Sequence, residues 1–245
     1  MLRLECAAVS GNVPSTERVG SKVERCGMRK VGSFLIVGIL VLGGTTAHAA
    51  AIAKMYKWES IGRTWTLTQA YAFDAYRYFR MLPRVSSYTD YAAYASDPSD
   101  DSALETLVRE LDALADEARL GAWERLNFVV SFVQSLRYVA EEGEYPRYPL
   151  ETLVEGCGDC EDLAILAAAI LGHLGYDVVL LAFTAELHMA VGVRVIPPDP
   201  SVYEAYEWNG AAYYYVEPTW VGWTIGARPA LYTSAPDIIP VSVGS

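Results

Sequence analysis

The segment 156–162, Gly-Cys-Gly-Asp-Cys-Glu-Asp, places a cysteine among small and acidic residues. Cys160 directly follows Asp159, a residue type that often caps helices, and an apolar run comes after it. We therefore expect Cys160 in the first turn of a helix, where unpaired N–H groups and partial positive charge favour a thiolate. The same N–H groups could bind the oxyanion of a tetrahedral intermediate. This setting favours a nucleophilic cysteine over an inert buried one.

The neighbours of Cys160 have supporting roles in this interpretation. Asp159 and Asp162 are three residues apart and can form a pair that resembles a capping box. Gly158 has no side chain, which would let a substrate backbone approach the sulfur. We interpret Glu161 and Asp162 as favourable charges at the helix start rather than as catalytic acids.

A thiolate nucleophile needs a base, and the sequence offers three histidines. His48 lies in the N-terminal segment, and His173 lies more than three helical turns beyond the cysteine, too far to reach the sulfur. His188 opens an apolar strand candidate, and Glu217 ends another, where it could orient the second ring nitrogen. The sequence therefore predicts a triad of Cys160, His188 and Glu217. A structural histidine and an ordinary acid at a strand end are the alternatives.

Cys157 and Cys160 also have the Cys-x-x-Cys spacing of a redox pair or of half a zinc site. Zinc would need further ligands, and only His173 and His188 are available, so we predict no metal site. A reversible disulfide between Cys157 and Cys160 that blocks the nucleophile stays open as a second role for Cys157.

Acidic residues outnumber basic ones, 30 to 19, and give the 245-residue chain a net charge of −11. Such a surface repels nucleic acid, and the sequence has no basic stripe and no glycine-rich phosphate loop. We therefore expect no nucleic-acid partner. The hydrophobic share of 52% is enough to build a core and excludes a disordered chain.

An uncharged stretch at 31–53 follows Arg29 and Lys30. It predicts either a signal peptide that is cleaved after Ala49 or an uncleaved helix that anchors the chain in a membrane. Both alternatives place the rest of the chain outside the cytoplasm, anchored or secreted. Residues 1–27 differ from the body and are expected to be an unstructured leader, with Met28 as a more natural start.

The pattern of apolar residues and turn signals divides the body into helices first and strands later. The second of the expected helices begins with Ser102 as its N-cap. Helices are expected over 68–81, 102–120, 122–139 and 159–174, and strands over 177–183, 188–196 and 213–217. This order predicts an α+β fold with N-terminal helices, a central helix that carries Cys160, and an antiparallel sheet.

The same pattern suggests how the chain is divided. We expect a signal or membrane segment at 28–53, an aromatic-rich extension at 54–101, a catalytic domain at 102–235 and a C-terminal tail at 236–245.

The order of Cys160, His188 and Glu217, with the cysteine opening a helix and the others on later strands, resembles the transglutaminase-like superfamily. The string at 158–162, with Leu-Gly-Tyr at 174–176, resembles the transglutaminase-like cysteine proteinases of prokaryotes. A longer pattern is similar to an archaeal-type set of transglutaminase-like proteins. Its elements are Tyr-Pro-Leu-Glu-Thr-Leu at 148–153, His-Met-Ala-Val-Gly-Val at 188–193 and Gly-Trp-Thr-Ile-Gly at 222–226. The resemblance covers roughly 120–230.

This resemblance implies a papain-like core and a cysteine peptidase or amidase that acts on a protein or peptide. Transamidation of glutamine is an alternative activity in the same superfamily. A non-catalytic extracytoplasmic binding module and a Cys-x-x-Cys redox protein are further alternatives. The superfamily usually has aspartate where this chain has Glu217, which is one methylene longer. Some members bind calcium, but the sequence has no loop of the EF-hand type, and we predict no cofactor.

Overall fold

The computed structural model describes residues 50–141 and 143–243. The leader expected at 1–27 and most of the signal or membrane segment expected at 28–53 lie outside the described residues. Within them, no helix is long and apolar enough to cross a bilayer. The last residues of that segment, 51–53, belong to a strand.

The centre of the fold is a five-stranded antiparallel sheet with the strand order β7-β8-β6-β5-β9. Two of its three inner strands, β5 and β6, are almost entirely buried, which agrees with their continuous apolar sequences. The strands are β5 (Asp177–Phe183), β6 (His188–Arg194), β7 (Ala205–Trp208), β8 (Ala211–Val216) and β9 (Asp237–Val241). Residues 237–241 of the expected C-terminal tail thus form the edge strand β9.

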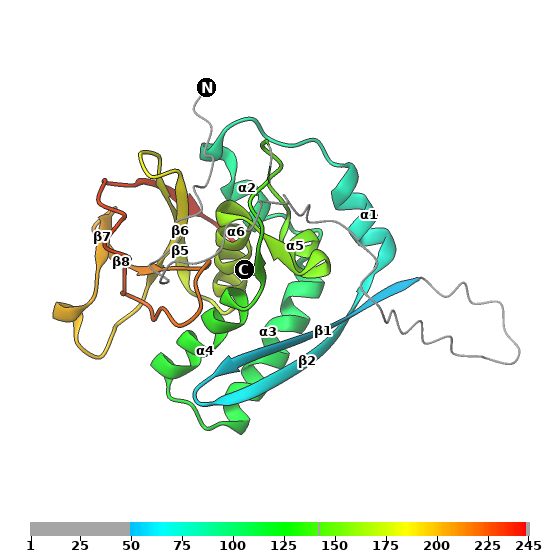
Figure 1. Cartoon of the computed structure of the whole chain (residues 1–245), viewed down its shortest axis with the longest axis horizontal. Helices are drawn as coiled ribbons and strands as arrows, with labels where there is room; N and C mark the ends of the chain where they lie inside the picture. Colours follow the sequence, from blue (N-terminus) through cyan, green and yellow to red (C-terminus); the bar gives the residue numbers. More distant parts are fainter. Residues whose placement is uncertain (1–49, 142, 244–245) are drawn as a thin grey trace, which may run out of the picture.

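Helix α6 (Cys160–His173) packs against β5 and β6 and lies in the middle of the molecule (Figure 1). Every residue from Cys160 to Leu171 is buried, as expected for a helix that is apolar all round. The helices around it precede it in the chain and complete its burial. They are α3 (Asp101–Glu117), α4 (Ala122–Gln134) and α5 (Pro149–Glu155).

A long hairpin of β1 (Ala51–Ser60) and β2 (Arg63–Ala72) lies along α3 and α4 (Figure 1). Its two-residue turn, Ile61-Gly62, has positive φ at both positions, which suits the twist of a hairpin. One face is exposed. The other places aromatic side chains in the core, among them Tyr56, Trp58, Trp65 and Tyr71.

The expected helix at 68–81 is therefore wrong in its first part, because β2 continues to Ala72 and α1 (Phe73–Met81) begins only there. The alternation of buried and exposed residues along β2 is the physical reason, since it gives the hairpin one apolar face. The segment between the helices expected at 68–81 and 102–120 contains two short helical segments, η1 (Tyr88–Asp90) and α2 (Ala92–Ala95).

The helices expected at 102–120 and 122–139 are confirmed as α3 and α4, but α4 ends five residues earlier. The chain then forms a short strand, β3 (Arg137–Tyr138), which pairs in parallel with β4 (Cys157–Gly158) just before α6. Ser102 is not the N-cap of α3, because Asp100 holds that position. Overall, the expected α+β class with helices, a central cysteine-bearing helix and an antiparallel sheet is confirmed.

Candidate functional site

The start of α6 has the expected capping geometry. The Asp159 side chain accepts a hydrogen bond from the Asp162 N–H at 3.5 Å, and the Asp162 side chain accepts one from the Asp159 N–H at 3.3 Å. A side chain at Gly158 would place its Cβ 2.5 Å from the Cβ of Asp162. The close approach of Asp162 is thus a structural reason for glycine at this position, separate from any role in admitting substrate.

The sulfur of Cys160 is fully buried, between its own helix start and the turn that leads into β6. It lies 3.3 Å from Oε2 of Glu161 and 4.0 Å from the carbonyl oxygen of Leu187. Leu187 has a φ of 53°, a left-handed conformation that is uncommon for a branched residue. This conformation occurs at the residue before His188, so the turn that approaches the sulfur also begins the strand of the expected base.

His188 and Glu217 meet across neighbouring strands, at the start of β6 and just after β8. Nε2 of His188 lies 3.1 Å from Oε2 of Glu217, and both side chains are buried. Because Glu217 engages Nε2, Nδ1 remains as the ring nitrogen that could serve a thiol. The structure thus brings His188 and Glu217 together and places Cys160 next to the residue that precedes His188.

Glu217 accepts hydrogen bonds from more than the imidazole. The Tyr215 hydroxyl donates to Oε2 at 2.6 Å, and the Thr219 N–H donates to Oε1 at 3.0 Å, where the Thr219 hydroxyl also donates. Burial alone would raise the pKa of Glu217, but the hydrogen bonds and charge of His188, with the donors Thr219 and Tyr215, outweigh burial and lower it. Glu217 is therefore a carboxylate at neutral pH, able to stabilise a protonated imidazole.

Two residues that the sequence did not indicate hold His188 and Glu217 in place. The ring of Tyr232 stacks on the His188 ring with centroids 4.1 Å apart and planes within 4°. The amide of Gln134, on α4, donates to the carbonyl oxygens of Glu217 and Trp223, each at 2.8 Å, and accepts from the Gly222 N–H at 3.2 Å. The detectable signal for Gln134 was an amide at the end of a helix that is otherwise largely apolar.

Arg147 was also missed, and it supports the helix start from behind. The backbone N–H of Arg147 donates to Oδ1 of Asp162 at 2.7 Å, and the guanidinium of Arg147 binds the carboxylates of Asp162, Glu141 and Glu155. Burial would lower the pKa of Arg147, but the charges of these three acids outweigh it and raise the pKa further. Arg147 thus stays cationic and fixes Asp162, one half of the capping pair.

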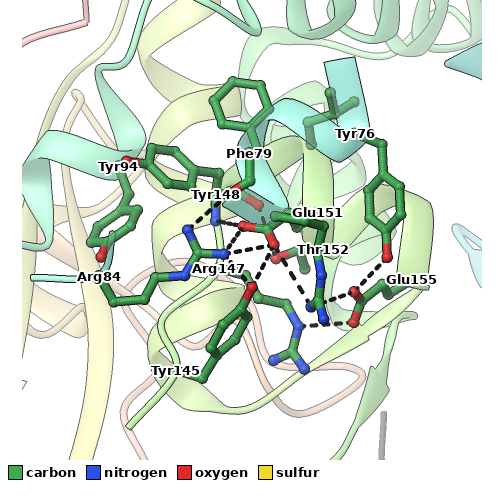
Figure 2. A network of polar contacts seen from close by, with 12 residues as sticks. Tyr76, Phe79, Arg84, Tyr94, Tyr145, Arg147, Tyr148, Glu151, Thr152 and Glu155 are labelled. Carbon is green, nitrogen blue, oxygen red and sulfur yellow. Dashed lines mark hydrogen bonds and ion pairs between the residues drawn. The ribbon is translucent and has the colours of Figure 1, made fainter. Parts of the chain in front are cut away.

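The network continues into the N-terminal part of the chain (Figure 2). Arg84 binds Glu151 at 2.8 Å, and the Tyr76 hydroxyl donates to Glu155 at 2.9 Å. Figure 2 shows these side chains converging on the face of α5 from which Glu151 and Glu155 project. The residues after the hairpin are in this way linked through α5 and Arg147 to the start of α6.

Acidic groups dominate the immediate surroundings of the sulfur. Burial, followed by the charges of Asp162 and Glu161, raises the pKa of Asp159 well above its usual range. Burial and the charge of Asp162 raise the pKa of Glu161 to about 8. The Asp159 and Glu161 side chains are also hydrogen-bonded to each other. Acids this close together stay protonated in part, because a buried site cannot hold several negative charges.

The described part of the chain contains no recognisable metal site. Among the described residues, no group of three or more His, Cys, Asp or Glu side chains could hold an ion. The calcium that the resemblance allows therefore has no ligand set among these residues.

Cys157 and Cys160 are both disulfide-bonded in the structure, and neither is a free thiol. The arrangement therefore describes an oxidised form. A nucleophilic role for Cys160 requires its reduction.

No protein-family model matches the sequence, and no curated protein matches it.

Proposed function

We propose that the chain is a thiol-dependent acyl-transfer enzyme that cleaves peptide or amide bonds, a cysteine hydrolase with a transglutaminase-like, papain-like core. In this proposal Cys160 is the nucleophile, His188 the base and Glu217 the orienting acid. The observation that carries it is the buried contact of 3.1 Å between His188 Nε2 and the carboxylate of Glu217. The Glu217 carboxylate accepts hydrogen bonds from His188, from Tyr215 and twice from Thr219. Burying an imidazole and such a carboxylate together costs free energy of folding, and this arrangement is typical of a catalytic base.

The reaction begins with transfer of the Cys160 thiol proton to His188. The thiolate attacks the carbonyl carbon and a C–S bond forms. The resulting oxyanion accepts a hydrogen bond from the backbone N–H of Cys160 at the helix start. The imidazolium, stabilised by Glu217, gives its proton to the leaving amine as the C–N bond breaks. Water then loses a proton to His188 and attacks the thioester. The C–S bond breaks, the acid product leaves, and His188 returns the proton to the sulfur, which restores the thiol and the free base.

An amine in place of water would make the same chain a protein-glutamine transamidase. The thioester intermediate and the roles of Cys160, His188 and Glu217 would be unchanged. Only the nucleophile that attacks the thioester, an amine instead of water, would differ. We favour hydrolysis because water is abundant and no amine-binding site is assigned. Product analysis with and without an added primary amine separates the two outcomes.

The oxidised cysteines support an extracytoplasmic location, because disulfides persist in oxidising compartments and are rare in the cytoplasm. We propose a secreted or membrane-anchored protein, held through its N-terminal segment if that segment is not cleaved. Its partner is a protein or peptide substrate, and nucleic acid is not expected.

The disulfide state also favours a second candidate function, thiol–disulfide exchange at the Cys-x-x-Cys sequence. The two functions differ in their need for Cys157. A Cys157→Ser variant should lose oxidoreductase activity but keep acyl transfer, provided that it is assayed after reduction.

The decisive experiment is labelling of the reduced protein with a thiol-directed activity probe, followed by profiling with a peptide library. Cys160→Ala should abolish labelling, His188→Ala should slow it, and Cys157→Ser should leave it intact. Unchanged labelling of Cys160→Ala would refute the nucleophile. Equal reactivity of Cys160 and Cys157 would instead indicate a non-catalytic binding module that has kept the fold.

A further inference from the structure

Glu161 is an acid placed directly against the reacting sulfur. It follows Cys160 in the chain, its side chain is only 3% exposed, and its Oε2 lies 3.3 Å from Sγ. Within the described residues it forms no ion pair with a lysine or arginine. The nearby cation, Arg147, is instead taken up by Asp162, Glu141 and Glu155. A helix start by itself accounts for an exposed acid, but not for one buried without a counter-ion.

The groups that face Glu161 come from several elements, and those nearest to it are acids. Asp159 shares a hydrogen bond with it, and the charges of Asp162 and Glu144 act on it. Tyr91 and Tyr138 are close enough for the charge of Glu161 to raise their pKa values, after the larger effect of burial. On the side of β6, the sulfur lies 4.0 Å from the carbonyl oxygen of Leu187, the residue before His188.

In these surroundings a second negative charge beside a thiolate is strongly unfavourable. The pKa of Glu161, raised by burial and by Asp162 to about 8, means that the carboxyl is mostly protonated at neutral pH. A protonated carboxyl has one O–H to donate. The sulfur of Cys160, 3.3 Å from Oε2, is the acceptor within reach of this O–H. In the hydrogen bond with Asp159, by contrast, Asp159 is the donor, since that bond raises the pKa of Asp159 and lowers the pKa of Glu161.

We propose that Glu161 is a further catalytic residue, whose neutral carboxyl donates a hydrogen bond to the Cys160 thiolate and whose ionisation disfavours that thiolate. The inference rests on the proposed nucleophile. It needs no net proton transfer, because the O–H bond of Glu161 is kept while the thiol proton goes to His188. A charge-assisted bond of this kind stabilises the anion more than a neutral one does.

This role has a specific signature in alkaline solution. Above about pH 8 the wild-type carboxyl becomes a carboxylate 3.3 Å from the sulfur, and the thiolate loses a donor and gains a repelling charge. In Glu161→Gln the amide still donates but cannot ionise. The ratio of the labelling rates, Glu161→Gln over wild type, should stay within about twofold at pH 6.5 to 7 and rise at least threefold by pH 9.5.

The experiment measures probe labelling of the reduced full chain between pH 6 and 10. Glu161→Ala, which has no donor, should be slower than wild type at pH 7. The matched control is Glu117→Gln, since Glu117 pairs with Arg63 on the exposed surface at 3.0 Å, away from Glu161 and the sulfur. Its ratio to wild type should not change with pH. A flat ratio for Glu161→Gln would overturn the proposal.

Two further results keep the test decisive. If the Glu161 variants do not fold, a ¹³C NMR titration of carboxyl-labelled glutamate in the wild type replaces them, and a Glu161 that is ionised at pH 6 overturns the proposal. A calcium requirement that Glu161→Gln removes would show a cation-binding carboxylate and would also overturn it. Failure of Cys160→Ala to abolish labelling would refute the nucleophile itself, which is a separate outcome.

Discussion

The ring of Tyr232 lies flat against the ring of His188, with centroids 4.1 Å apart and an interplanar angle of 4°. Tyr232 comes from the loop between β8 and β9, whose backbone is held by Glu186. That carboxylate accepts hydrogen bonds from the N–H groups of Thr233 and Ser234, each at 2.8 Å. The imidazole is therefore fixed on its edge by Glu217 and on one face by an aromatic ring.

Tyr232→Ala should slow probe labelling of Cys160 by roughly tenfold, because stacked aromatic pairs contribute about 0.5–1.5 kcal/mol and the ring would lose its orientation. Tyr232→Phe keeps the stacked ring and should remain within about twofold of wild type. Labelling rates of the reduced proteins at one pH measure both. Equal rates for the alanine and phenylalanine variants would show that the stack does not position the base.

Glu217→Gln should slow labelling by roughly tenfold or more, since the amide cannot stabilise a protonated His188. It should also lower the free energy of unfolding by about 1–3 kcal/mol, because at least one of the donors on Tyr215 and Thr219 would face an amide N–H₂. Glu217→Asp keeps the charge with a shorter side chain and should retain more activity than glutamine. Urea denaturation and labelling separate the two effects, and a more active glutamine variant would contradict the orienting role.

Arg147→Met should lower the free energy of unfolding by about 3–5 kcal/mol, because it leaves Asp162, Glu155 and Glu141 without their shared cation in a buried site. Arg194→Met is the matched control, since Arg194 pairs with Asp177 on the exposed surface at 3.5 Å. That change should cost less than about 1 kcal/mol. Urea denaturation of both variants makes the comparison, and similar losses would mean that the network adds little.

Asp100→Asn should reduce the dependence of stability on pH. Burial raises the pKa of Asp100 to about 7, although the Leu150 N–H donates to it at 3.1 Å and acts in the opposite direction. Between its usual pKa of 3.8 and about 7 the folded state binds more protons at this site than the unfolded state. The Asp100 contribution therefore lowers the free energy of unfolding as pH rises, by at most about 1.4 kcal/mol per pH unit.

Denaturation of wild type and Asp100→Asn at several values between pH 4 and 7 measures this slope difference. The asparagine oxygen can still accept from Leu150, so the variant should fold. Glu105→Gln, which alters an exposed acid of α3, is the control variant for this comparison. Parallel slopes for wild type and Asp100→Asn would contradict the prediction.

The local features of the site could be read from the sequence because they depend on neighbouring residues. The capping pair of Asp159 and Asp162 and the strand at 177–183 follow from spacing and from an apolar run. The cap of α3 shows the limit of such reasoning. Ser102 has suitable chemistry, but the N-cap lies two residues earlier, at Asp100, whose side chain accepts a hydrogen bond from the Leu150 N–H instead.

The supports of the site could not be read from the sequence, because they join residues far apart in the chain. Gln134 reaches the carbonyl oxygen of Glu217, and Tyr232 reaches His188, only after the sheet has formed. The hairpin at 51–72 was missed for a different reason. Its first residues continue an uncharged stretch, and its aromatic residues suit either a helix or a strand. Only the two-residue turn at Ile61-Gly62 distinguishes a hairpin from a helix in this segment.

The position of β9 has a consequence for how the chain behaves during synthesis. Strand β9 covers one edge of β5, pairing Val178–Ala182 with residues 237–241, and β5 is one of the most apolar strands of the sheet. Until residue 241 has been made, β5 presents an open, apolar hydrogen-bonding edge to other chains. A chain shortened before Asp237 would keep that edge permanently, and we expect it to aggregate even with every residue of the proposed triad still present.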